Sequence, residues 1–170
     1  MKLTSIQKVF ATIALFGLVV LFAGCPYSSS VPIDEGSLNV PDIEGKWVRL
    51  TDKGTDNPTY FELKKDDKNH ATVLKYEFSS SDSIYESTTY HLTFSDVGGD
   101  TFMNAIEEGG SSYSLFKFNY DKEIGQITTY EVTDYIKETF NTSGELKAFI
   151  QKNKEASYFF TNTVDDYVRM

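Results

Sequence analysis

From Gly45 onward, the chain is a series of short segments rich in aromatic and β-branched residues, with turn-forming residues between them. Turn sequences such as Asp66-Asp67-Lys68-Asn69, Gly98-Gly99 and Gly109-Gly110 join consecutive segments through very few residues. Connections this short favour antiparallel hairpins over parallel crossovers. The pattern therefore predicts an all-β domain, an antiparallel meander that closes as a sandwich or barrel. The predicted strands are residues 45–50, 59–65, 71–78, 84–94, 101–107, 113–120, 124–132 and 156–163.

Two short helices are expected late in the chain. The first spans residues 133–138. The second begins at a capping box, in which the Thr142 hydroxyl and the Glu145 carboxylate each accept a hydrogen bond from a free backbone N–H. Leu146, Phe149 and Ile150 then form one apolar stripe at helical spacing, which we expect to pack over the β-sheet.

The N-terminus has the composition of a targeting signal. A positively charged start is followed by an apolar run over residues 9–22, which is short for a membrane span of about 20 residues. The sequence Leu21-Phe22-Ala23-Gly24-Cys25 resembles a bacterial lipobox, with Phe22 where leucine is usual. The resemblance implies a lipoprotein signal peptide over residues 1–24 and lipidation of Cys25, for example with palmitate. An ordinary secretory signal or an uncleaved anchor is the alternative.

This interpretation places the protein in the bacterial cell envelope, anchored to a membrane by lipid and either periplasmic or surface-exposed. Cys25 is the sole cysteine, so no intramolecular disulfide is expected. Residues 25–42 are rich in serine, proline and aspartate without any period, which predicts a flexible tether. The first 24 residues carry two lysines and no acid, so the rest of the chain carries a net charge of −11 against −9 for the whole. Such a surface repels phosphate, which argues against nucleic-acid binding.

The first predicted strand contains the only tryptophan and one of the two arginines. Gly45-Lys46-Trp47 resembles the G-x-W signature of the lipocalin and calycin β-barrels, and Arg169 is similar in placement to the late arginine that packs across that tryptophan. The resemblance implies an eight-stranded antiparallel up-and-down β-barrel over residues 43–170. An arginine can stack on an indole while donating to backbone carbonyls. Arg169 is the predicted partner of Trp47, and Arg49 is the competitor.

The sequence nominates no catalytic constellation, and we expect no enzyme, cofactor or metal site. His70 lies in a turn and His91 on the polar face of a strand, without the spacing of metal ligands. Neither Asp66-Asp67 nor Asp165-Asp166 lies in a calcium-loop pattern. No serine lies in a nucleophile-elbow motif.

Aromatic side chains on the predicted strands are candidates to line a cavity, because an eight-stranded barrel is just wide enough to hold one small ligand or to be filled. We therefore keep two functions open. The first is a lipid-anchored, lipocalin-like protein that binds a small hydrophobic or amphipathic molecule. The second is a structural lipoprotein with a filled barrel that contacts a protein partner. The candidate cavity residues are Phe61, Tyr76, Tyr90, Phe94, Phe102, Phe116, Phe118 and Tyr130.

Overall fold

The computed structural model describes residues 27–170, so the predicted signal peptide and the predicted lipidation site, Cys25, lie outside the described residues. The strands are β1 (Ser28–Ser29), β2 (Gly45–Arg49), β3 (Tyr60–Lys65), β4 (His70–Ser79), β5 (Ile84–Val97), β6 (Asp100–Glu107), β7 (Tyr113–Asp121), β8 (Gln126–Val132) and β9 (Phe160–Arg169). A short 3-10 helix, η1 (Leu50–Asp52), follows β2, and an α-helix, α2 (Ser143–Asn153), precedes β9.

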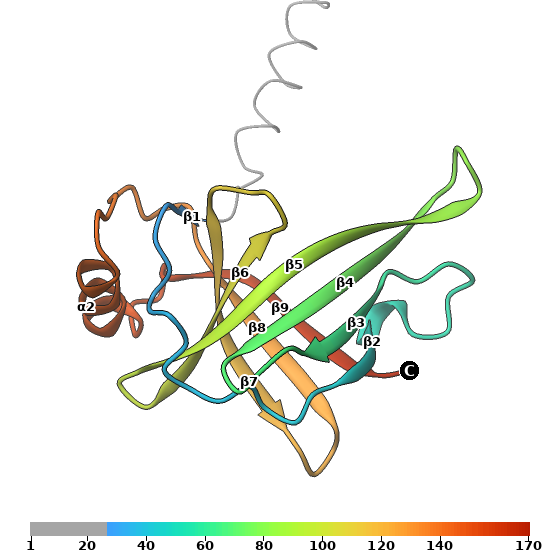
Figure 1. Cartoon of the computed structure of the whole chain (residues 1–170), viewed down its shortest axis with the longest axis horizontal. Helices are drawn as coiled ribbons and strands as arrows, with labels where there is room; N and C mark the ends of the chain where they lie inside the picture. The colour runs from blue at the N-terminus through green and yellow to red at the C-terminus, as the bar shows by residue number, and fades with distance from the viewer. Residues whose placement is uncertain (1–26) are drawn as a thin grey trace, which may run out of the picture.

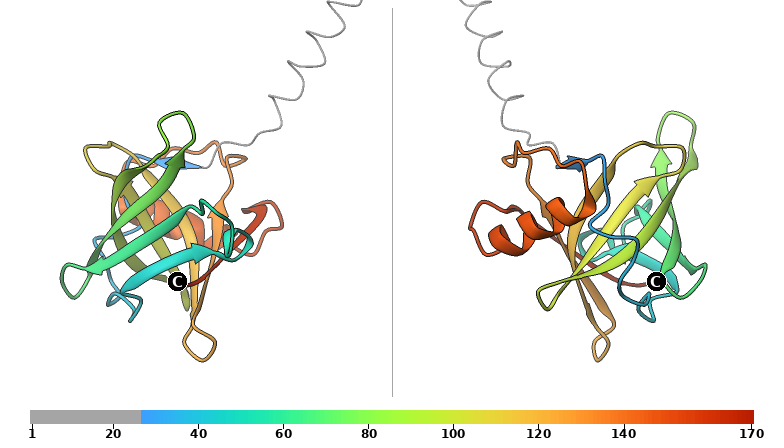
Figure 2. Two further views of the ribbon diagram at one scale, coloured as in Figure 1. Left: turned by 90° about the vertical axis from the view of Figure 1, so that its right-hand side faces the viewer. Right: turned by 60° about the vertical axis from the view of Figure 1, so that its left-hand side comes forward.

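Strands β2 to β9 form a closed antiparallel barrel (Figure 1). Each strand pairs with the next in the chain, and β9 returns to pair with β2. Strand β1 lies outside this circuit, against the start of β7. The predicted eight-stranded antiparallel up-and-down barrel is therefore confirmed. Helix α2 begins with the predicted capping box, and it packs on the outside of the wall (Figure 2).

Two expected elements differ in the structure. Residues 133–138 form a turn and an irregular segment rather than a helix, and Ile136 is buried against the wall of the barrel. The last strand is β9, over 160–169 rather than 156–163. The two aspartates of β9 are compatible with a strand because side chains of the neighbouring strands pair with them. Asp165 forms an ion pair with Arg49 of β2, and Asp166 accepts a hydrogen bond from the Thr128 hydroxyl of β8.

The β4–β5 hairpin extends beyond the body of the barrel (Figure 1). Tyr60, the first residue of β3, pairs with Tyr76, and β6 pairs with β5 only from Tyr90 onward. The end of the hairpin is therefore a two-stranded ribbon. Aromatic rings stabilise one side of this ribbon: Tyr60 stacks on Tyr76, with ring centroids 4.6 Å apart, and Tyr85 packs edge-on against Phe78.

Two hydrophobic clusters make up the core. One fills the end of the barrel where β2 begins, and it contains Trp47 and Phe94. The other lies outside the wall, where α2 and the N-terminal segment cover β5, β6 and β7, and it contains Phe102, Leu146 and Phe159. Phe159 and Phe102 are fully buried in this second cluster. The predicted apolar stripe of the helix supplies Leu146 and Ile150 to it, with Phe149 at its edge.

Residues 27–43 pack along the barrel, which differs from the flexible tether predicted for 25–42. Near one end of the barrel, the Tyr27 N–H donates to the Val132 carbonyl, and at the other end the Val40 N–H donates to the Lys68 carbonyl. Ile33 and Ile43 are almost completely buried. The segment has no strand or helix period because it binds mainly through single apolar side chains and hydrogen bonds to distant residues. The folded domain therefore includes residues 27–42.

Asp34 joins this segment to two other elements. Its carboxylate accepts hydrogen bonds from the Ser95 hydroxyl of β5 at 2.6 Å and from the Lys147 ammonium of α2 at 2.7 Å. Beside it, the Asn104 side chain accepts from the Ile33 N–H and donates to Ser95. Burial alone would raise the pKa of Asp34, but the hydrogen bonds from Lys147, Ser95 and Ser37 outweigh it and lower the pKa to about 2.

Candidate ligand-binding pocket

The barrel contains a cavity of about 560 Å³ that opens at one end. The opening lies where β2, β4 and β8 end and where β3, β7 and β9 begin, and we call this end the mouth. The other end is covered by residues 38–43. A volume of this size falls within the range of sites for small molecules. The barrel is therefore hollow toward the mouth, which we call its upper part, and filled toward the opposite end, its lower part.

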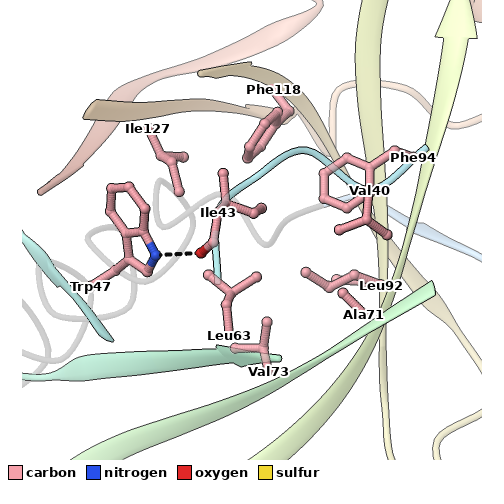
Figure 3. Close-up of a cluster of buried hydrophobic side chains, with 11 residues drawn as sticks. Val40, Ile43, Trp47, Leu63, Ala71, Val73, Leu92, Phe94, Phe118 and Ile127 are labelled. Atoms are coloured by element: carbon pink, nitrogen blue, oxygen red, sulfur yellow. Dashed lines mark hydrogen bonds between the residues drawn. The ribbon is translucent and has the colours of Figure 1, made fainter. Parts of the chain in front are cut away.

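The floor of the pocket is apolar. The floor is part of the hydrophobic cluster that contains Trp47 and Phe94, which Figure 3 shows. In this cluster the Trp47 indole N–H donates to the Ile43 carbonyl at 2.8 Å. The indole thus has its one polar group satisfied while its ring stays 1% exposed. The other apolar side chains that contribute to the floor are Leu63, Val73, Leu92, Phe118 and Ile127.

Arg169, and not Arg49, closes the lower end beside the tryptophan. Its guanidinium lies over the Trp47 ring, 4.8 Å from the centroid, and donates to the Glu44 carbonyl at 2.7 Å. Gly45 makes this approach possible, because a Cβ at that position would lie 2.8 Å from the Arg169 Nη1. Gly45 also has a φ of +123°, which side chains disfavour. The position of the Arg169 guanidinium over Trp47 therefore depends on glycine at position 45.

Charged side chains form the upper wall. Arg49 forms an ion pair with Asp165 at 3.2 Å, and Lys75 forms one with Glu77 at 2.9 Å. Glu131 also lines the pocket, and within residues 27–170 its carboxylate has no hydrogen bond or ion pair. With Asp52, which also lines the pocket, four carboxylates face two cations. The upper wall is therefore polar and carries an excess of negative charge.

The ionisation of this wall follows from its surroundings. Burial raises the pKa of Glu131, and the negative charge of Asp165 raises it further. Partial burial would lower the pKa of Arg49, but Asp165, Tyr167 and Asp52 together outweigh this effect and raise it. Burial also raises the pKa of the Tyr167 hydroxyl, which lines the pocket next to Arg49. Glu131 is thus the carboxylate whose charge a cationic group would stabilise most directly.

Comparisons with protein families, with curated proteins and with solved structures find no match to this chain. The geometry of the pocket is therefore the basis for any functional statement.

Five of the eight candidate cavity residues face the interior. Phe61, Tyr90, Phe116 and Phe118 line the pocket. Phe94 lies deeper, fully buried in the cluster below the floor, where it packs edge-on against Phe118. These five residues come from β3, β5 and β7, whose inward positions follow from the register.

The predictions for Tyr76, Phe102 and Tyr130 are wrong, because these side chains face outward. In β4, the register pairs inward Phe61 with Lys75, so Tyr76 points outside and stacks on Tyr60. In β6, Met103 lines the pocket, so Phe102 lies in the outer cluster under α2. In β8, the inward positions are taken by polar residues on either side of Tyr130, which packs against Phe160.

The charged residues of the pocket are not among the cavity residues predicted from the sequence. These charged residues alternate with apolar ones, as Lys75 does with Leu74, so the apolar side chains of β4 are the ones that the sequence favours for the interior. The signal that was available is the position of Arg49, two residues after Trp47 and on the same face of its strand. The other charged pocket residues are Asp52, Lys75, Glu77, Glu131 and Asp165.

No metal centre is visible in the part of the chain that the structure describes. Within residues 27–170, no group of three or more histidine, cysteine, aspartate or glutamate side chains is arranged to hold a metal ion. His70 instead contacts the Asp67 carboxylate at 2.9 Å in an exposed turn, and His91 is exposed. None of the described helices combines the length and the apolar composition that crossing a membrane requires.

Proposed function

We propose that this protein is a lipid-anchored lipoprotein of the bacterial cell envelope whose lipocalin-like barrel binds one small amphipathic molecule. The observation that carries this proposal is the division of the pocket into an apolar floor and a charged upper wall. An apolar chain or ring is favoured on the floor because it removes apolar surface from water. A polar head group is favoured at the mouth, where it keeps partners in the wall and in solvent.

The half-filled barrel supports the first of the two functions that the sequence leaves open. A filled barrel in a structural or protein-interaction lipoprotein has no need for charged side chains that point inward, since a charge withdrawn from water is costly without compensation. Here the charges gather around an open cavity, and Glu131 has no partner among the described residues. A binding pocket gives these charges a role. We therefore favour the ligand-binding protein, without a catalytic activity.

Binding is tested by the fluorescence of Trp47, the only tryptophan, which lines the floor. The probe is a twelve-carbon amphiphile with bromine near the end of its chain, because bromine quenches an indole only at close contact. We expect saturable quenching. The variant Ala105→Phe fills the pocket from its wall and abolishes the quenching. The matched control Ala148→Phe, on the exposed face of α2, retains it. Absence of quenching with wild-type protein, for all head groups tried, favours the structural alternative.

The anchor is tested separately. Cys25→Ser is expected to abolish incorporation of labelled palmitate and retention in the membrane fraction, because one or more acyl chains supply the membrane affinity. Quenching of Trp47 by the brominated probe stays unchanged, since residue 25 lies outside the barrel in sequence. Unchanged palmitate labelling in this variant contradicts lipidation at Cys25.

A further inference from the structure

We propose that the mouth of the barrel faces the lipid bilayer and that the apolar side chains around it rest on the membrane surface. This inference rests on the lipidation of Cys25 in the proposed function. It adds an orientation, and with it a route for the ligand between the pocket and the membrane.

The first observation is where the folded chain begins. Tyr27 is fixed beside the end of β8: its N–H donates to the Val132 carbonyl and its hydroxyl donates to the Glu138 carbonyl, both at 3.1 Å. Its side chain is 7% exposed. Only Pro26 separates Tyr27 from Cys25, so covalent geometry limits the two Cα atoms to a separation of about 7.6 Å. The acylated residue is therefore held close to the barrel, without a tether that would let the domain turn freely.

The second observation is which end of the barrel this is. Glu131, next to Val132 at the end of β8, lines the pocket, as does Ser114 at the start of β7. Strand β1 pairs with that same part of β7, because Ser28 lies opposite Ser114. The chain thus enters the domain at the mouth. In Figures 1 and 2, β1 and the tip of the β4–β5 hairpin lie toward one end of the barrel, and the β7–β8 turn lies at the other.

The third observation is an apolar rim at this end. Leu50, Ile84 and Tyr135 are 47%, 55% and 73% exposed, and Tyr85 lies beside Ile84 at the base of the hairpin tip. They come from η1 after β2, the start of β5 and the turn after β8, which are all connections at the mouth. Water does not favour such side chains, whereas tyrosine and aliphatic residues are well accommodated at a membrane interface. A bilayer brought to this end by the anchor is therefore the surface that suits them.

The orientation has a consequence for binding. An amphiphile that leaves the bilayer at the mouth can turn its tail into the barrel there, so the tail reaches the apolar floor without crossing bulk water. The negative charge at the mouth also selects the surface, because anionic headgroups would be repelled by carboxylates such as Glu131 and Asp52. A neutral or zwitterionic bilayer is the membrane that fits best.

The experiment places a nitroxide spin label at each end of the acylated protein in phosphatidylcholine vesicles. Ile84→Cys labels the mouth, and Ile124→Cys, in the β7–β8 turn and 68% exposed, is the matched control at the opposite end. Lipidation consumes the Cys25 thiol, so each variant has one reactive site. We expect the label at position 84 to lose access to a water-soluble nickel relaxation agent on reconstitution, while the label at position 124 keeps it.

Four outcomes decide the orientation. Loss of nickel access at position 84 alone supports it, and restored access when Cys25→Ser is added supports it further. Equal nickel access at both positions in protein whose acylation is verified by mass overturns the proposed orientation. Loss at position 124 alone overturns it as well. Quenching of Trp47 by the brominated probe, measured on the same samples, reports the pocket independently, so failure of the orientation is distinguishable from failure of ligand binding.

Discussion

Replacing Asp34 with asparagine removes the charge that links the N-terminal segment to β5 and α2. The pKa of Asp34 falls from its ordinary value of 3.8 to about 2 in the folded protein. At about 1.4 kcal/mol per pKa unit, this difference corresponds to about 2.5 kcal/mol of folding free energy. The carboxylate is partly exposed, 22% on the side chain, so screening by water reduces the expected loss to about 1–2 kcal/mol at pH 7.

The destabilisation caused by Asp34→Asn should decrease as the pH falls. A carboxyl whose folded pKa is lowered stabilises the protein fully above its unfolded pKa, and the stabilisation disappears as the pH falls toward the folded value. The difference in unfolding free energy between wild type and Asp34→Asn is therefore largest at pH 6–7, falls to about half at pH 3 and is small at pH 2. Urea unfolding followed by Trp47 fluorescence measures it, because the indole is buried only in the folded barrel.

Asp56→Asn is the control for this experiment, since Asp56 lies exposed in the loop between η1 and β3. It should change the unfolding free energy little at any pH. Lys147→Met should lose a similar amount to Asp34→Asn, and the double variant should lose less than the sum, because both single changes break one ion pair. A difference between wild type and Asp34→Asn that stays constant from pH 7 to pH 3 would refute the electrostatic origin of this link.

Three further predictions concern the barrel and its pocket. Arg169→Ala should lower the unfolding free energy by about 1–3 kcal/mol in urea, through lost stacking on Trp47 and a lost hydrogen bond; an unchanged midpoint contradicts the closure. Twelve-carbon amphiphiles with a trimethylammonium head should bind more tightly than those with a carboxylate or sulfate head. Glu131→Gln should reduce this preference for the trimethylammonium head, because it removes a negative charge. Lowering the pH should reduce the preference as well, because Glu131, whose pKa is raised, becomes protonated; binding titrations of both amphiphiles at pH 7.5 and pH 4.5 test this. Phe102→Ala should lower the unfolding free energy by about 3–5 kcal/mol without changing the affinity for the probe, because Phe102 lies outside the barrel wall. Phe61→Ala should weaken probe binding more than folding, because Phe61 lines the pocket. Equal effects of the two variants on probe binding contradict the assignment of Phe102 to the outside and Phe61 to the inside.

The barrel was predictable because its signals are local. Turn residues such as Gly98 and Gly99 join β5 to β6, and hairpins of this kind leave little choice of pairing between neighbouring strands. The capping box at Thr142 is also local, since its two hydrogen bonds span three residues. The closing pair of β2 and β9 is distant in sequence. Its prediction depended on a resemblance rather than on any period.

The faces of the strands were harder to predict because several strands are covered on both sides. In β6, Phe102 and Met103 are adjacent and both are apolar: one meets α2 and the other lines the pocket. Alternation cannot identify the inner face of such a strand. The prediction of a flexible tether for the N-terminal segment was wrong for another reason. Asp34 is held by Lys147, more than a hundred residues away, and no local pattern reports a hydrogen bond at that distance.

The path of residues 27–43 along the outside of the wall sets an order of events during biosynthesis. This segment is made before every strand of the barrel, yet the groups that hold it are made much later: Asn104, then Val132, and finally Lys147 of α2. The segment therefore cannot complete its packing until nearly the whole chain has been made. Under the proposed lipidation of Cys25, the enzymes that cut and acylate this cysteine would therefore act on a chain whose residues 27–43 are not yet bound to the barrel, and the segment would pack against the barrel afterwards.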